Sequence, residues 1–207
     1  MMWPPCDGLP YFAVVRALLD RCSSVDQALP TLADIPVAWC TNVIVTDAGG
    51  EAALIEVAGK DRATRRLGRE SPGRFLCATN HFVSPELHAY AVNRRREPVT
   101  RRRTIESRLG AATPLSKELI RDLLSEPYPH GVCLHHYADG LGTLWSTIWS
   151  VTETAVVVCL GAPSSVKNPW RRFGLQDPVG ITQYPAHIPD RRAGPGFWEW
   201  LPPGSDG

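Results

Sequence analysis

The hydrophobic period of this chain changes near residue 39, and that change constrains the fold most strongly. Upstream, apolar residues recur at the spacing of an amphipathic helix. They are Tyr11, Val14, Val15, Leu18, Leu19 and Cys22. Downstream, residues 39–46 and 51–57 have the pattern of strands, joined by the turn sequence Asp47-Ala48-Gly49-Gly50. We therefore expect helical structure followed by an antiparallel hairpin.

The rest of the chain adds further helices and strands in groups. Ser24 and Gln27 have the spacing of a capping box, which predicts a second helix that ends between Pro30 and Pro36. Further strands are expected at residues 62–67, 74–79, 132–137, 143–151 and 155–160, and further helices at about 99–109 and 116–124. Strands, then helices, then strands indicate an α+β protein with antiparallel sheet and packed helices.

The strand at 143–151 is expected in the middle of a sheet. Trp145 and Trp149 occupy one face, and Leu144 and Ile148 occupy the other. Two apolar faces are typical of a strand that is covered on both sides. We therefore expect both tryptophans to be buried.

Length and composition favour a single domain. The 207 residues, 43% of them hydrophobic, suffice for one core, which we place at residues 1–190, with a poorly ordered Pro/Gly-rich tail at 191–207. Lys and Arg number 22 against 21 Asp and Glu, so net charge gives no argument for binding nucleic acid or a membrane. The longest apolar run is strand-sized and the first residues lack signal-peptide features, so a cytoplasmic protein is expected.

Cysteine usage and motif content argue against disulfides and cofactors. The six cysteines form no CxxC pair and fall mostly in apolar segments, which favours reduced, buried thiols. The sequence has no GxGxxG motif, no Walker-type GxxxxGK motif and no GxSxG motif. No cofactor is expected.

Cys133, His135, His136 and Asp139 have the side chains of a metal site. Neighbouring side chains on a strand point to opposite faces, however, so only Cys133 and His135 would share one face. No metal site is expected. Six arginines cluster at 94–96 and 101–103; the balanced net charge favours a solvated helix face over a phosphate-binding patch.

Asn80 is the strongest candidate for chemistry. It follows the apolar run at 74–77 within Ala78-Thr79-Asn80-His81-Phe82. A side-chain amide at a strand end is held by the sheet and can donate hydrogen bonds to a developing oxyanion without changing its charge. We therefore expect Asn80 to end a strand and to face a pocket. The alternative is an ordinary turn-forming Asn.

Asn80 also belongs to an ordered series of short motifs. The series runs Gly8-Leu9-Pro10-Tyr11, Asn42 to Gly50, Thr79 to Phe82, Gly142 to Ser146 and Asn168 to Arg171. In this order the motifs resemble the carboxy-terminal part of the penicillin acyltransferase-like family. Its members are N-terminal-nucleophile hydrolases of linear amides, related to bile-salt hydrolases and penicillin V acylases. The resemblance spans most of residues 8–190.

The resemblance implies part of a four-layer αββα sandwich and an acyl-handling mechanism. A Cys thiol would attack an amide or thioester carbonyl, its own α-amino group would be the base, and Asn80 would hold the oxyanion. Arg101, beside Thr100, is the best match for the family's pocket arginine, and Arg103 is a close second. The implied partner is an acyl amide or acyl-CoA, with either hydrolysis or acyl transfer as the outcome.

The family's Cys nucleophile lies well upstream of the Leu9-Pro10-Tyr11 helix. Cys6 is a poor substitute, since two prolines precede it and it lies too close to Asn80 for the family's layout. The resemblance therefore leads us to expect a truncated or split enzyme, inactive unless an upstream chain supplies the Cys. The alternatives are a non-catalytic relative that binds an acyl ligand or a protein partner, and an arginine-patch nucleic-acid binder.

Overall fold

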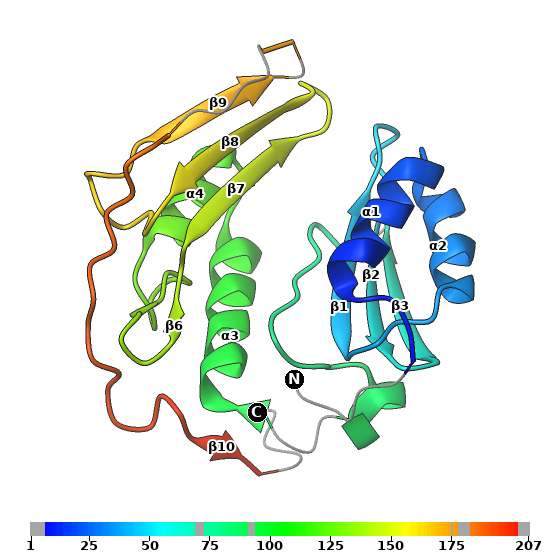
Figure 1. The fold of residues 1–207 in the computed structure, drawn as a ribbon, viewed down its shortest axis with the longest axis horizontal. Coiled ribbons are helices and arrows are strands. Elements are labelled where there is room, and N and C mark those ends of the chain that lie inside the picture. The colour runs from blue at the N-terminus through cyan, green and yellow to red at the C-terminus, as the bar shows by residue number, and fades with distance from the viewer. Residues whose placement is uncertain (1–6, 69–72, 91–93, 175, 178–182, 203–207) are drawn as a thin grey trace. The chain divides into compact units, whose positions relative to one another are not determined.

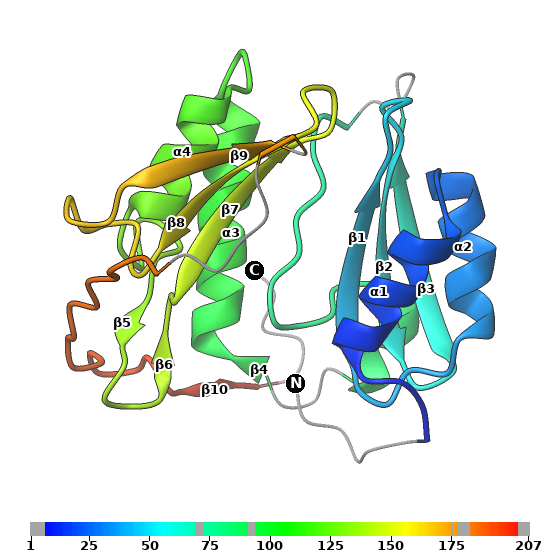
Figure 2. The same cartoon turned by 45° about the horizontal axis from the view of Figure 1, so that its top comes forward.

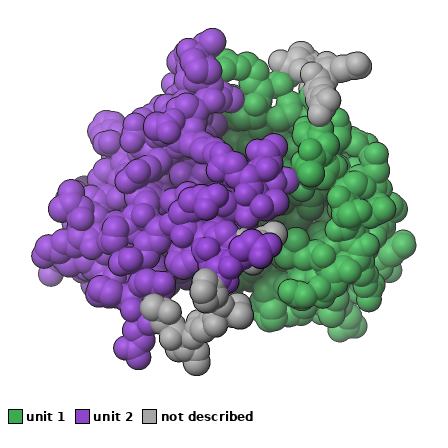
Figure 3. All heavy atoms as spheres, turned by 90° about the horizontal axis from the view of Figure 1, so that it is seen from above, with its two compact units in different colours: residues 1–99, 199–207 green, residues 100–198 purple. Residues whose placement is uncertain are grey.

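The structure is a computed structural model that describes residues 7–68, 73–90, 94–174, 176–177 and 183–202. Two compact units contain these residues: one comprises the chain up to Val99 and from Glu199 onward, and the other runs from Thr100 to Trp198 (Figure 3). Both combine helices with antiparallel strands, which confirms the α+β class. Within the described ranges, no helix is both long enough and apolar enough to span a membrane.

Two helices begin the first unit (Figure 1). α1 spans Tyr11–Arg21 and α2 spans Val25–Asp34, both as the sequence predicts. The Ser24 hydroxyl accepts a hydrogen bond from the Gln27 backbone N–H at 3.3 Å. The Gln27 side chain accepts from the backbone N–H of Ser23 at 2.8 Å, one residue earlier than in a standard capping box. The start of α2 is therefore satisfied by side chains from both directions.

The first sheet has the antiparallel order β1-β2-β3, with β1 at Thr41–Thr46, β2 at Ala52–Ala58 and β3 at Asp61–Leu67. Ala53, Ile55 and Val57 of the central strand pack in one core cluster with residues of α1 and α2. Figures 1 and 2 show both helices against the same side of this sheet. The alternation of β2 therefore directs its odd-numbered residues toward the helices.

The opposite face of β2 is covered by the chain that follows β3. Leu54 and Glu56 are each 1% exposed, and Ala58 clusters with Phe82 and Leu87. Leu87 lies on the short 3-10 helix η1, Pro85–Tyr90. β2 is therefore buried on both faces, by helices on one side and by a connecting segment on the other.

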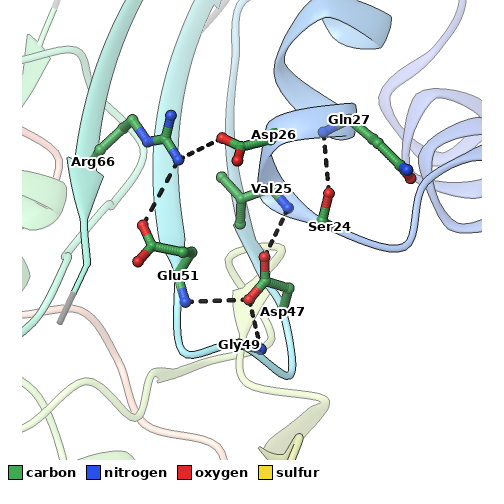
Figure 4. A network of polar contacts seen from close by, with 8 residues as sticks. All are labelled: Ser24, Val25, Asp26, Gln27, Asp47, Gly49, Glu51 and Arg66. Atoms are coloured by element: carbon green, nitrogen blue, oxygen red, sulfur yellow. Dashed lines mark hydrogen bonds and ion pairs between the residues drawn. The ribbon is translucent and has the colours of Figure 1, made fainter.

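The β1–β2 turn is fastened to the start of α2 through Asp47 (Figure 4). One carboxylate oxygen accepts the backbone N–H of Val25 at 2.9 Å, and the other accepts those of Gly49 at 2.9 Å and Glu51 at 3.2 Å. These bonds to the charged form lower the pKa of Asp47, with the Val25 bond first among them. A carboxylate at a helix start also opposes the helix dipole favourably.

One sequence prediction about the first unit is wrong. Residues 74–78 form no strand, and Thr79 makes only an isolated bridge with His81. The described part of the tail contains β10 at Trp200–Leu201, which pairs with β4 at Arg94–Arg95. An apolar run indicates burial but does not provide a partner strand, and a proline-rich segment can still pair where its N–H groups are available.

The second unit places helices on one side of a second antiparallel sheet. α3 spans Arg96–Ala111 and α4 spans Lys117–Ser125, where Ser116 caps α4 by accepting the Leu119 N–H at 3.1 Å. The sheet has the order β7-β8-β9, with β7 at Trp145–Ser150, β8 at Ala155–Leu160 and β9 at Trp170–Gly174. α4 lies behind β7 and β8 in Figure 1. The expected strand at 132–137 is reduced to β5, His135–His136, paired with β6, Leu141–Gly142.

The expected burial of the β7 tryptophans is wrong. Among the described residues β7 is an edge strand, and Trp145 is 61% and Trp149 70% exposed. Ser146, on the opposite face, is buried beside its cross-strand partner Cys159. The face that carries Ser146 and Cys159 is therefore covered, and the face that carries the tryptophans is exposed among the described residues.

Candidate functional site

Asn80 lies in a short segment, Thr79–Ser84, that crosses the first sheet on the face away from α1 and α2. We call this stretch the Asn80 segment. Its anchor is Phe82, which is 1% exposed and packs with Ala58 and Ala63 of the sheet. Burying a phenylalanine from a loop fixes that loop against the sheet.

Two polar side chains of the sheet hold the backbone of the Asn80 segment. Asn42 and Glu56 are direct cross-strand neighbours on β1 and β2. The Asn42 amide donates to the carbonyl oxygens of Thr79 at 2.6 Å and His81 at 3.2 Å. The Glu56 carboxylate accepts the backbone N–H groups of Val83 at 2.8 Å and Ser84 at 2.9 Å. We call Asn42 and Glu56 the polar clamp.

The polar clamp resolves a problem that any buried loop faces. Backbone N–H and C=O groups removed from water need partners, and a loop has no ladder to supply them. The amide of Asn42 serves two acceptors and the carboxylate of Glu56 serves two donors, so one cross-strand pair satisfies both ends of the segment. Bonds to an ionised group are the stronger kind.

The segment is also fastened from within. The Thr79 hydroxyl lies 2.9 Å from Nδ1 of His81 and donates to the carbonyl oxygen of Pro98 at 2.9 Å. His81 is buried. These contacts leave the backbone around Asn80 with little freedom.

Asn80 itself lies at a bend and is exposed. This corrects the expected placement at a strand end facing a pocket, because the segment is held by side chains rather than by strand pairing. Asn80 is therefore an exposed residue within a clamped segment.

The arginines predicted as site or surface residues fall in different surroundings. Arg101 lies on α3 in the second unit and is half-buried, whereas Arg103 is exposed. Arg102 forms an ion pair with Glu106 one turn later, and Arg96 donates to Glu199 at 2.8 Å. The Arg95 guanidinium lies 5.5 Å from the ring centre of Trp200. Several members of the cluster therefore have partners within the chain.

The described cysteines are structural thiols. Cys77, Cys133 and Cys159 are buried, and Cys22 and Cys40 are half-buried, all without a disulfide. Burial raises the pKa of Cys159, whose Sγ lies 3.4 Å from the carbonyl oxygen of Asn168. A buried thiol with a raised pKa is a poor nucleophile. Cys6 lies outside the described residues.

The Cys133, His135 and His136 group forms no metal cluster within the part of the chain that the structure describes. His135 and His136 direct their Nδ1 atoms to the carbonyl oxygens of Pro189 at 3.2 Å and Arg191 at 2.9 Å. These backbone partners tie β5 to the later chain.

Sequence reasoning missed the polar clamp, although one signal was present. Glu56 is the lone charged residue in the apolar strand Ala52–Ala58. A carboxylate at the centre of a buried strand costs free energy unless donors surround it. Such a residue indicates that a neighbouring segment supplies backbone N–H groups.

Comparison with known families gives one match. The model of the family described as acyl-coenzyme A:6-aminopenicillanic acid acyl-transferase matches residues 4–165. Comparisons with curated proteins and with solved structures give no match. The matched range includes the polar clamp, the Asn80 segment and most of the second unit's sheet. The chain belongs to the acyl-coenzyme A:6-aminopenicillanic acid acyltransferase family.

Proposed function

We propose that this chain supplies the oxyanion side of an acyl-handling site, with Asn80 as the donor and an acyl-CoA or acyl amide as the substrate. The observation that carries the proposal is the polar clamp, which holds the segment around Asn80 in a chain of an acyltransferase family. Donors stabilise an oxyanion best when no reorganisation is needed at the moment of reaction. The clamp limits the movement of the backbone on either side of Asn80, which supports this requirement.

The attacking thiol is proposed to lie outside the described residues. The five described cysteines support this, because each is buried or half-buried. The thiols of Cys22 and Cys159 also make hydrogen bonds, to the Thr31 hydroxyl and to the backbone of Asn168. Arg101 is proposed to orient the amine of the nucleophile or a substrate carboxylate through its fork of donors. Either an amine or water could then receive the acyl group.

Residues 1–190 are proposed, on the strength of the family, to form part of an αββα sandwich. In each unit helices cover one face of an antiparallel sheet. Antiparallel sheets with helices packed on one face are the elements from which such a layered fold is built.

The first experiment measures binding and turnover by the purified full chain. Binding of a non-hydrolysable thioether analogue of an acyl-CoA is measured by calorimetry, and turnover is measured with acyl-CoA and an amine acceptor. In any preparation that turns over, Asn80→Ala should lower kcat by about 10²- to 10³-fold, as expected for loss of one oxyanion donor. Glu86→Gln, an exposed change on η1, is the control and should leave kcat unchanged.

The possible outcomes separate the hypotheses. Unchanged kcat in Asn80→Ala would remove Asn80 from the site. Loss of turnover in folded Cys22→Ala or Cys40→Ala would contradict the placement of the thiol, and Cys6→Ala decides whether Cys6 is that thiol. Binding without turnover would favour a non-catalytic relative that retains an acyl ligand. The absence of both binding and turnover would contradict the proposed function.

A further inference from the structure

The second unit contains a cavity of about 670 Å³ lined by residues of that unit alone. Ser164 and Pro189 form part of its wall. Arg108 and Arg191 bring positive charge to the lining, and Asp122 and Glu126 bring negative charge. A cavity of this size accommodates a small organic molecule.

Behind the wall, Ser164 is hydrogen-bonded to a buried histidine. The Ser164 Oγ lies 2.9 Å from Nε2 of His135, which is 4% exposed. Nδ1 of the same ring lies 3.2 Å from the carbonyl oxygen of Pro189. A carbonyl oxygen can only accept, so Nδ1 carries the ring proton and Nε2 keeps its lone pair. The Ser164 hydroxyl therefore donates its hydrogen bond to an unprotonated ring nitrogen, which can accept the proton.

The surroundings of His135 favour this neutral form. Burial lowers the pKa of His135, and the charges of Arg191 and His136 lower it further, while the Pro189 bond acts in the opposite direction. A neutral imidazole oriented by a fixed acceptor is the arrangement required of a general base.

The loop that carries Ser164 is rigid because Asn168 is buried inside it. The Asn168 amide donates to the carbonyl oxygens of Ala162 at 2.8 Å and His187 at 2.7 Å, and its Oδ1 accepts the N–H of His187 at 2.7 Å. Ser165 N–H closes the turn onto Ala162 at 3.0 Å. Side chains on such a loop keep the geometry that their hydrogen bonds define.

We propose that Ser164 and His135 form a second nucleophile–base pair, which accepts the acyl group of a small carboxylic ester bound in this cavity. Ser164 Oγ forms a bond to the ester carbonyl carbon and passes its proton to His135 Nε2. The carbon–oxygen bond to the alcohol breaks, and the departing oxygen takes that proton. Water then attacks the acyl-serine through the same base, which releases the carboxylic acid and restores the Ser164 hydroxyl.

The adjacent residue provides a matched control. Ser165 Oγ lies 3.1 Å from Nδ1 of His187, but this histidine is exposed and Ser165 Oγ also accepts the N–H of Lys167 at 3.3 Å. Both serines and His187 line the cavity. The two pairs therefore share one cavity and differ in the burial and orientation of the histidine.

The test uses a fluorophosphonate, which forms a phosphorus–oxygen bond to an activated serine and releases fluoride. Labelling of the full chain is followed by intact mass and located by peptide mapping. We expect one label at Ser164, none in Ser164→Ala, and a rate about 10²- to 10⁴-fold lower in His135→Gln, the usual range for loss of a general base. Ser165→Ala and His187→Gln should lower the labelling rate far less than His135→Gln does, and Glu86→Gln, an exposed change on η1, should be labelled at the parent rate. The hydrolysis rate of 4-nitrophenyl acetate should follow the labelling rate across this series.

Circular dichroism tests whether each variant is folded, and Ser164→Ala changes a single half-buried side chain. An unlabelled parent, a label on another residue, or labelling of folded Ser164→Ala at the parent rate would overturn the proposal. The labelling test depends on Ser164 and His135, whereas the test of the proposed acyl site depends on Asn80. Failure of one proposal is therefore distinguishable from failure of the other.

Discussion

Strand β2 of the first unit and strand β7 of the second have apolar side chains on both faces in sequence, yet only β2 is buried on both faces. On β2, helices cover one face and the Asn80 segment covers the other. On β7, the face that carries Trp145 and Trp149 is exposed among the described residues. The two strands differ because a chain segment covers the second face of β2. That segment, the Asn80 segment, buries Phe82 against the sheet, and the polar clamp hydrogen-bonds its backbone. Burial of both faces of a strand therefore depends on hydrogen-bond partners for the backbone of the covering chain as much as on the apolar side chains of the strand.

The largest effect on stability is expected from a change at Phe82. Phe82→Ala removes the anchor of the covering segment and leaves a cavity against Ala58 and Ala63. We expect the free energy of unfolding to fall by about 3–5 kcal/mol, measured by urea denaturation of the full chain. A loss near zero would show that the Asn80 segment does not cover β2.

Glu56→Ala tests the contribution of the polar clamp to holding the Asn80 segment on β2. The change leaves the buried N–H groups of Val83 and Ser84 without their acceptor, and we expect a loss of about 2–4 kcal/mol in the free energy of unfolding. Glu51→Ala, a change of the same kind immediately before β2, is the matched control and should cost much less. Equal losses in the two variants would contradict a special role for Glu56.

Replacing Asp47 by a neutral residue should lower stability by an amount that depends on pH. Because backbone hydrogen bonds lower the pKa of Asp47 in the folded chain, its contribution to stability is present above the unfolded pKa and is lost as pH falls through the folded value. Asp47→Asn should lower the melting temperature at pH 7, and the gap to the parent should narrow as pH falls below about 4. A gap that is constant with pH would contradict the contribution of the charged form.

The smallest effect is expected on β7. Trp149 is 70% exposed, so Trp149→Ala should change the free energy of unfolding by less than about 0.5 kcal/mol. Burial of Trp149 on a central strand would instead have predicted a large loss in the free energy of unfolding. A loss above about 3 kcal/mol would show that the Trp face is covered in solution.

Local sequence signals predicted much of the fold because they act locally. α1 follows from its apolar period, α2 from the Ser24 cap, and the β1–β2 hairpin from the turn at Asp47 to Gly50. α3 begins three residues earlier than expected, at Arg96. β9 was missed, because its five residues, Trp170–Gly174, lie in a region rich in proline and glycine.

The errors arise where the outcome depends on distant residues. The run at 74–79 is apolar because it approaches the core, but pairing needs a free neighbouring edge that sequence does not reveal. Asn80 could be singled out from its sequence neighbours, whereas the partnership of Asn42 and Glu56 required knowledge of the register between β1 and β2. Ser164 and His135 are 29 residues apart in sequence, and no local pattern links them.

The polar clamp fixes the backbone of the segment that carries Asn80. Amide hydrogen exchange at Val83 and Ser84 tests it most directly, since both N–H groups donate to Glu56. We expect slow exchange in the parent and exchange at least about tenfold faster in Glu56→Ala, with the amides of α1 little changed, because opening of this segment would then be local. Exchange at Val83 and Ser84 that is fast in the parent, or equally slow in folded Glu56→Ala, would contradict the claim.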